Sequence, residues 1–97
     1  MRQGEIRTYL GRPRILIVSN NAVNMTAYPV AVPVGRQPLD VPGFLIPFTD
    51  QDPVSGHADV GRLGIIDPEH LGEPDALLSG ATLHRVLAAI HALFDPE

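Results

Sequence analysis

The alternation of hydrophobic and polar positions predicts a chain of short strands that ends in one helix. Residues 3–10 alternate and are rich in β-forming side chains, which predicts a first strand that turns at Gly11. Residues 15–18 form an unbroken aliphatic run, as expected of a strand covered on both faces. Further strands are predicted at residues 28–34, 44–48 and 60–66, with loops or turns at residues 35–40, 49–57 and 72–75.

The final segment carries a helical pattern. Ser79 is a suitable N-cap, and Asp95 with Pro96 ends the pattern. The apolar residues between these limits recur at the spacing of one helix face: Leu83, Val86, Leu87, Ile90, Leu93 and Phe94. The whole pattern predicts one domain over residues 1–97, mainly β with a C-terminal helix. In it a curled, barrel-like antiparallel sheet of about five strands packs against one amphipathic helix.

Turn-forming residues separate these elements. Pro29 and Pro33 cannot donate to a β ladder, so we expect them at a sheet edge, a strand end or a bulge. Asp67 can cap a turn in which Pro68 takes the first position. A turn or short helical loop is also predicted after residues 15–18, where four side chains can bond the nearby backbone: Ser19, Asn20, Asn21 and Asn24.

The composition narrows the class of protein. The 97 residues contain no cysteine, which excludes a disulfide framework and thiolate metal sites. With no leader pattern and no apolar run near the ~20 residues that cross a bilayer, we expect a cytoplasmic chain with no membrane role. His84 and His91 lie about two turns apart on one helix face, so no metal site is predicted.

Charge is divided unevenly along the chain. Residues 1–36 hold five arginines and one acid, and residues 37–97 hold two arginines and ten acids, so the two parts carry +4 and −8. There is no lysine. Every fixed cation is therefore a guanidinium, which suits phosphate binding through paired hydrogen bonds, although genomic base composition could also replace lysine by arginine.

Short motifs occur in a characteristic order. They are Gly-Glu-Ile at residues 4–6, an Arg/Pro pair at 12–13, Val-Ser-Asn at 18–20, Val-Pro at 32–33, Ser-Gly at 55–56, Leu-Gly at 71–72 and Leu-Ser at 78–79. In this order and spacing the chain resembles the MazF/PemK family of bacterial toxins along essentially its whole length. The resemblance implies an SH3-like barrel of the CcdB/PemK type.

The resemblance also implies an activity. Members of the family are homodimeric toxins of type II toxin-antitoxin systems, encoded beside an antitoxin, and they cleave single-stranded RNA without a metal. It therefore implies an endoribonuclease with no cofactor, whose partners are single-stranded RNA, a cognate antitoxin and a second copy of the chain. Such chemistry needs a base for the ribose 2′-hydroxyl, a cation for the developing charge and an acid for the leaving 5′-oxygen.

Two arginines compete for the family's catalytic arginine at the start of the second strand. If Ser19 is aligned with the family's serine and no gap is introduced, Arg14 lies one position after the family's catalytic arginine. The order of arginine and proline is then the reverse of the family's order. Keeping Arg12 in register instead requires one extra residue, which a bulge could absorb. Arg12 and Arg14 are therefore rival candidates.

The family's catalytic threonine falls on Gly35, which has no side chain for acid or base work. Arg36 follows directly and can hold phosphate, but a guanidinium is a poor proton carrier. His57, in the Ser-Gly loop, is the candidate that could replace the threonine as proton carrier, because imidazole titrates near neutrality. The alternative for His57 is an exposed loop histidine.

Other side chains could contact substrate. Tyr9 is the best stacking candidate for an RNA base, and Ser19 and Asn20 could contact phosphate or base edges, although turn capping also explains both. The predicted catalytic residues are thus Arg14, Arg12 and Arg36, and the predicted substrate contacts are Ser19, Asn20, Tyr9 and His57. Gly35 and the acidic second part favour an alternative function: a catalytically degenerate MazF/CcdB-like protein that acts through a protein partner, as a topoisomerase poison or regulatory module.

Overall fold

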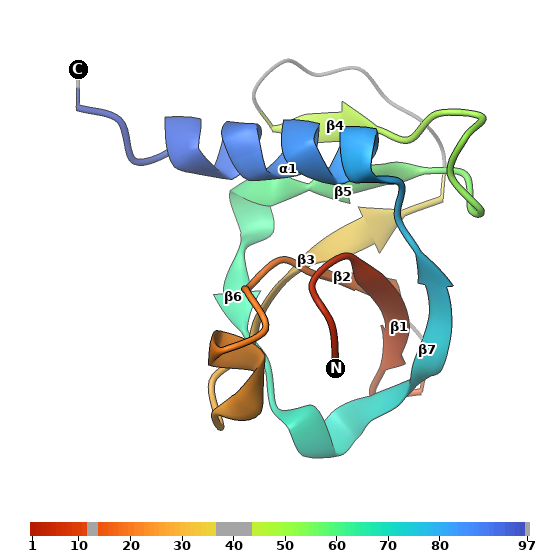
Figure 1. Cartoon of the computed structure of the whole chain (residues 1–97), viewed down its shortest axis with the longest axis vertical. Coiled ribbons are helices and arrows are strands. Elements are labelled where there is room, and N and C mark those ends of the chain that lie inside the picture. The colour runs from red at the N-terminus through yellow and green to blue at the C-terminus, as the bar shows by residue number, and fades with distance from the viewer. Residues whose placement is uncertain (12–13, 37–43, 97) are drawn as a thin grey trace.

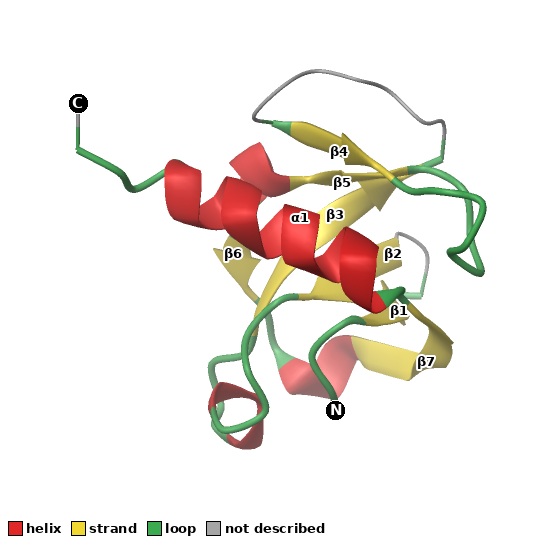
Figure 2. Cartoon of the chain, turned by 45° about the horizontal axis from the view of Figure 1, so that its top comes forward, coloured by secondary structure: helices red, strands yellow, loops and turns green. Residues whose placement is uncertain are grey.

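A computed structural model describes residues 1–11, 14–36 and 44–96, which form one antiparallel sheet and a C-terminal helix (Figures 1 and 2). The helix is α1 (Gly80–Ala92), and the 3₁₀ helices are η1 (Val23–Met25), η2 (Val60–Arg62) and η3 (Pro68–His70). The strands are β1 (Glu5–Tyr9), β2 (Arg14–Ile17), β3 (Val30–Gly35), β4 (Leu45–Pro47), β5 (His57–Asp59), β6 (Gly64–Ile65) and β7 (Leu71–Leu77).

The sheet is strongly curled, as Figure 1 shows. Its strand order is β4-β5-β3-β2-β1-β7, and β6 pairs with β3 beside β5. Within the described residues no pairing joins β4 to β7, so the sheet is not closed. The predicted class, mainly β with a C-terminal helix, is confirmed, and the barrel-like sheet is an open one.

The register brings three strand ends to the same margin of the sheet. Arg14 of β2 lies opposite Val34 of β3, which in turn lies opposite Ala58 of β5. In the next row Gly35 lies opposite His57. The start of β2, the end of β3 and the start of β5 are therefore neighbours, although they are far apart in the sequence.

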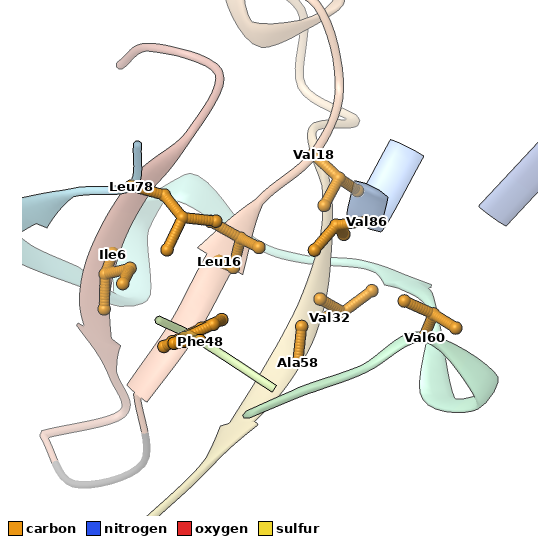
Figure 3. Close-up of a cluster of buried hydrophobic side chains, with 9 residues drawn as sticks. All are labelled: Ile6, Leu16, Val18, Val32, Phe48, Ala58, Val60, Leu78 and Val86. Atoms are coloured by element: carbon orange, nitrogen blue, oxygen red, sulfur yellow. The ribbon is translucent and has the colours of Figure 1, made fainter. Parts of the chain in front are cut away.

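Two apolar clusters cover the two faces of the central strands. The larger cluster packs against α1, whose Val86 is completely buried (Figure 3). Its buried members are Ile6, Leu16, Val18, Val32, Phe48, Ala58, Val60, Leu78 and Val86. The smaller cluster joins Ile15, Ile17 and Ala31. Because side chains alternate along a strand, the unbroken apolar run of β2 supplies both clusters, as predicted for a strand covered on both faces.

Helix α1 begins as predicted. The Ser79 hydroxyl accepts a hydrogen bond from the Thr82 backbone N–H at 3.3 Å, which satisfies one of the amides left without a partner in the first turn. The middle of the predicted apolar face packs against the larger cluster. The end of the predicted apolar face is not buried, because Leu93 and Phe94 are exposed.

Residues 60–66 do not form the continuous strand that their pattern predicts. The strand begins earlier, at His57, and β5 is followed by η2 and the two-residue strand β6. Gly61 explains part of the change, because a Cβ at this position would lie 2.9 Å from the Phe44 ring. The glycine therefore permits the close approach of η2 to the residue that precedes β4.

The turn predicted at residues 72–75 is also wrong, because these residues belong to β7. Pro74 is tolerated there because β7 is an edge strand, and the ladder with β1 shifts register on both sides of Arg7. Gly72 is needed for a different reason: a Cβ on it would lie 2.1 Å from the Thr8 hydroxyl oxygen. The pairing with β1 thus overrides the local turn preference.

The two prolines near β3 lie at different places relative to the strand. Pro29 immediately precedes β3, as expected of a strand end. Pro33 lies inside β3, opposite Ile15 of β2, where we expected an edge, an end or a bulge. On its other side β3 pairs with β6 only at residues 30–31 and with β5 only at residues 34–35. Pro33 therefore falls in the gap between two partner strands.

Candidate functional site

The margin where β2 begins, β3 ends and β5 begins brings together several of the predicted site residues. We call this group the site edge and define it as Arg14, Gly35, Arg36 and His57. Arg14 and His57 are the first residues of their strands, Gly35 is the last residue of β3, and Arg36 is exposed. Arg12, the rival of Arg14, lies outside the described residues.

Arg14 forms an ion pair with Asp75 of β7. The distance from Nε to Oδ2 is 3.0 Å, and the two side chains are 46% and 39% exposed. The contact uses the Nε side of the guanidinium, and neither terminal nitrogen has a hydrogen bond within the described residues. Because a guanidinium presents five donors, Arg14 retains the capacity to bind a phosphate.

His57 and Gly35 pack unusually closely. A Cβ on Gly35 would lie 2.1 Å from Cε1 and 2.3 Å from Nε2 of His57, so the imidazole occupies the space of a side chain at position 35. Gly56 has φ of +133°, and a Cβ on it would lie 2.0 Å from the Gly35 carbonyl oxygen. The two glycines together allow the start of β5 to approach the end of β3.

The register separates the site edge into two faces. Arg14 lies in the row of Val34 and Ala58, whose side chains belong to the larger cluster. Gly35 and His57 lie in the next row and therefore face the other side of the sheet. The two faces meet at the strand ends, where Arg14 and His57 are each the first residue of a strand.

Tyr9 lies on the same face as His57, but it also has a structural role. Its hydroxyl accepts a hydrogen bond from the Asp67 backbone N–H at 3.0 Å, and its ring contacts His70 edge-on with centroids 6.1 Å apart. The ring also packs against the smaller cluster. Tyr9 thus holds η3 against β1, and stacking on an RNA base stays a prediction.

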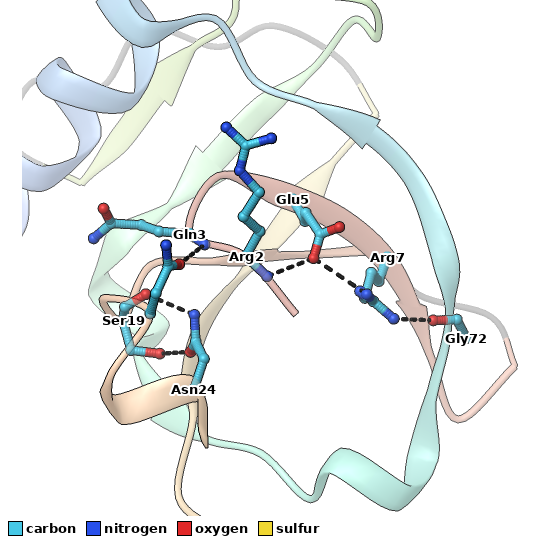
Figure 4. Close-up of polar contacts among 8 residues, drawn as sticks. Arg2, Gln3, Glu5, Arg7, Ser19, Asn24 and Gly72 are labelled. Carbon is cyan, nitrogen blue, oxygen red and sulfur yellow. Dashed lines mark hydrogen bonds and ion pairs between the residues drawn. The ribbon is translucent and has the colours of Figure 1, made fainter. Parts of the chain in front are cut away.

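Ser19 and Asn20 do not join the site edge. They follow β2, at its opposite end from Arg14, about 16 Å away at the usual rise of a strand. The Ser19 hydroxyl contacts the Asn24 side-chain oxygen and accepts the Val30 backbone N–H at 2.9 Å, and Asn20 Oδ1 accepts the Val23 backbone N–H at 2.9 Å. Both side chains therefore hold the η1 turn, the alternative left open by the sequence; Figure 4 shows Ser19 beside Asn24.

Beside this turn, α1 and the end of β2 border a cleft of about 590 Å³. Its lining is mainly apolar and includes Val18, Val23, Leu87 and Ile90. Ser19 and Asn20 lie on its wall. This cleft is separate from the site edge, because the two features lie at opposite ends of β2.

Arg7 has a role that the sequence analysis missed. Its Nη1 donates to the Gly72 carbonyl oxygen at 2.9 Å, and its Nη2 pairs with Glu5 Oε1 at 3.2 Å (Figure 4). The same Glu5 oxygen accepts the Arg2 backbone N–H at 2.6 Å. Arg7 thus fastens β7 to β1. The i, i+2 spacing of Glu5 and Arg7 on one strand face was the available sequence signal.

Asp52 is a second residue that the sequence analysis missed. Its carboxylate accepts hydrogen bonds from the Thr49 and Ser79 backbone N–H groups, both at 2.8 Å, and from the Thr82 hydroxyl at 2.6 Å. Burial alone would raise the pKa of Asp52, but hydrogen bonds from Thr49, Thr82 and Ser79 together lower that pKa from 3.8 to about 2. Asp52 is therefore a charged structural link between the loop after β4 and the start of α1.

Within residues 1–11, 14–36 and 44–96, no group of three His, Asp or Glu side chains is placed to hold a metal ion. No helix in these same ranges is both long enough and apolar enough to cross a membrane.

Sequence comparisons and structure comparisons give different results. No protein-family model matches the sequence, and neither does any curated protein. An endoribonuclease from a mycobacterial species matches with a TM-score of 0.89 and 26% identity over 100% of this chain and 94% of the other. A mycobacterial endoribonuclease in complex with its cognate antitoxin matches with a TM-score of 0.85 and 28% identity, over 100% and 98%.

A more distant match supports the same fold. MazF in a MazE-MazF complex from Deinococcus radiodurans has a TM-score of 0.79 and 22% identity, over 96% of this chain and 94% of the other. This chain thus has the fold of these three matched proteins, a mainly β sheet with a C-terminal helix. The MazF fold extends over 96% of this chain, which confirms the fold that the sequence resemblance implied.

Proposed function

We propose that this chain is the toxin of a type II toxin-antitoxin system and that it cleaves single-stranded RNA in the cytoplasm without a metal ion. The observation that carries the proposal is the site edge, which presents Arg14, Arg36 and His57 on a MazF-like fold. Support also comes from two full-length structural matches at 26% and 28% identity whose proteins are described as endoribonucleases.

Arg14 has the main catalytic role in this proposal. Its guanidinium binds the phosphate of the cleaved bond and stabilises the negative charge that accumulates when the 2′-oxygen attacks phosphorus. Arg36, exposed after β3, binds the same or the neighbouring phosphate. Arg12 remains the alternative to Arg14. The O2′–P bond forms as the P–O5′ bond breaks, which yields a 2′,3′-cyclic phosphate and a 5′-hydroxyl.

A cognate antitoxin is the proposed protein partner. We expect it to present an acidic, partly disordered segment that competes with RNA for the arginines. The ion pair of Arg14 with Asp75 supports this idea, because a carboxylate already fits beside the guanidinium. One of the matched mycobacterial endoribonucleases was solved with its antitoxin.

A homodimer is proposed as the assembly. Ile65, Leu93 and Phe94 are 68%, 37% and 71% exposed in the single chain. Burying large apolar side chains of this kind contributes ~1.5–3 kcal/mol each. Light scattering on the purified protein should give twice the mass of one chain, and Phe94→Glu should lower the apparent mass. A monomer at micromolar concentration would contradict the assembly.

The function is tested with a labelled single-stranded RNA and four proteins: the unmodified chain, Arg12→Ala, Arg14→Ala and the control Arg62→Ala, which removes an exposed arginine of η2. Cleavage should be slowed ~10²-fold or more by loss of the correct arginine, as expected for a positioned charge donor. The control should cleave like the unmodified chain. Equal cleavage by all four proteins would remove both arginines from the mechanism.

A second candidate function follows from Gly35. A protein that has lost nuclease chemistry and acts through a protein partner would need no proton carrier at this position. In that case the purified, folded protein should leave RNA intact while a defined partner copurifies with it.

A further inference from the structure

We propose that His57 is the general base of the cleavage reaction and that Gly35 is the residue that makes room for it. The inference rests on the proposed RNA-cleaving function and deepens it. Two independent observations support it. The first is the position of the imidazole ring, and the second is that no other side chain of the site edge can accept a proton near neutral pH.

The position is defined by backbone packing. Gly35 and His57 are directly opposed in the antiparallel ladder of β3 and β5. The imidazole lies where a side chain at position 35 would begin, 2.1 Å from the ideal Cβ position at its nearest atom. Gly56, which precedes His57, lets the backbone lie close to the Gly35 carbonyl oxygen, because a Cβ at position 56 would lie 2.0 Å from that oxygen. A side chain from β5 therefore fills the space that a residue of β3 would otherwise fill.

The chemistry requires such a group. Arg14 and Arg36 can stabilise a phosphate, but a guanidinium stays protonated at the pH of a cell and cannot accept a further proton. Imidazole is the side chain best suited to accept and release a proton near neutral pH. Within the site edge His57 is the one residue of this kind, since Gly35 has no side chain.

The surroundings of His57 are compatible with this role. Asp59 is two residues further along β5 and faces the same side of the sheet. On the β4 side, His57 pairs with Pro47, whose carbonyl oxygen accepts a hydrogen bond from Arg85 at 2.5 Å. The charged residues on the elements beside His57 are thus Asp59, Arg85, Arg36 at the end of β3, and Arg14 at the start of β2.

Neutral His57 accepts the proton of the ribose 2′-hydroxyl while the O2′–P bond forms. The P–O5′ bond breaks, and the leaving 5′-oxygen takes a proton from water. The products are a 2′,3′-cyclic phosphate and a 5′-hydroxyl, and the imidazolium returns its proton to solvent.

The experiment compares the unmodified protein with His57→Gln and His57→Ala on a single-stranded RNA, from pH 5 to 9. We expect kcat to fall ~10²–10⁴-fold in both variants, the usual contribution of a general base. The rise in rate between pH 5 and 8 should disappear with the imidazole. Added imidazole should partly restore the His57→Ala variant, because a purely structural histidine would give no such rescue.

His91→Ala is the matched control, since it removes an exposed histidine from the last turn of α1. Melting temperatures of all variants separate lost chemistry from lost folding. If His57→Gln cleaves within about threefold of the unmodified protein, or keeps its pH profile at a lower rate, His57 is not the base. If the unmodified protein cleaves no RNA, the proposed function itself fails, and the two failures are thereby distinguished.

Discussion

Arg14 and Asp75 form an ion pair that crosses over β1. Arg14 is opposite Thr8 of β1, and β1 pairs in turn with β7, which carries Asp75. The Nε–Oδ2 distance is 3.0 Å, and both side chains are about two-fifths exposed. Exposed pairs of this kind are worth ~0–1 kcal/mol. An RNA phosphate can therefore displace Asp75 from Arg14 at little cost.

Removing the carboxylate should strengthen RNA binding. Asp75→Asn abolishes the competition for Arg14, and we expect the KM for RNA to fall up to ~5-fold at low salt, the equivalent of about 1 kcal/mol. The difference should shrink as salt screens the charges. Glu73→Gln, which changes an exposed acid on the same strand, is the control. Weaker RNA binding by Asp75→Asn would mean that Asp75 positions Arg14 instead of competing for it.

Restoring the family's threonine at position 35 should be harmful on its own. Gly35→Thr places a side chain into the His57 ring, and we expect the free energy of unfolding to fall by ~1–3 kcal/mol, as for other overpacked sites.

The double variant Gly35→Thr/His57→Ala is the matched control for this prediction. It removes the ring and should recover most of the loss. Urea unfolding of Gly35→Thr, His57→Ala and the double variant, each against the unmodified chain, measures the coupling between the two positions. Additive effects would show that the imidazole does not occupy this space in solution.

The sequence predicted elements whose pattern is local. Alternation located β1, and the Ser79 cap located the start of α1 within one residue. The sequence pattern did not predict β7, because Gly72 and Pro74 favour a turn. Only the long-range pairing with β1 overrides that preference. A strand at the sheet edge can tolerate such residues, but edge position is not visible in a single sequence.

The sequence predicted only part of the candidate site, again because contacts that depend on long-range strand pairing are not visible in a single sequence. The position of Gly35 after a Val-Pro strand end was visible from the motifs, and so was the chemical suitability of His57. Their contact was not, because it depends on the register of β5 against β3. Ser19 was predicted as a substrate contact, but the structure shows its hydroxyl bonded within the turn that follows β2.

Ser19→Ala should therefore affect stability and spare catalysis. The change removes the hydroxyl that contacts Asn24 and accepts the Val30 N–H, and Asn24 is buried. We expect a loss of ~1–3 kcal/mol in the free energy of unfolding, the cost of leaving buried polar groups without partners. The kcat/KM for RNA, measured well below the melting temperature, should be unchanged. Asn21→Ala, at an exposed position nearby, provides the comparison.

Asp52 should make the stability of the fold depend on acid pH. Its pKa is lowered from 3.8 to about 2, so the folded state favours the charged form. This shift contributes about 2 kcal/mol to the free energy of unfolding, at 1.36 kcal/mol per pKa unit, and the contribution is complete above pH ~4. It is lost as the pH falls from about 4 to about 2, because the unfolded chain then binds the proton first.

Asp52→Asn should thus be less stable than the unmodified chain at pH 7, and the difference should largely vanish at pH 2. Denaturant unfolding at the two pH values measures it, with Asp50→Asn as the exposed neighbour that should change little. A difference that is the same at both pH values would contradict the role assigned to the charge.

The most direct test of the central claim is to incubate the purified protein with a long single-stranded RNA in EDTA and map every new end. An Arg12→Ala/Arg14→Ala double variant, checked for folding, is treated in parallel. We predict cuts at defined short sequences that carry 2′,3′-cyclic phosphate and 5′-hydroxyl ends and that are absent from the double variant. Intact RNA from a folded protein, or identical cuts from the double variant, would contradict the assignment of this site as a metal-independent RNA-cleaving centre.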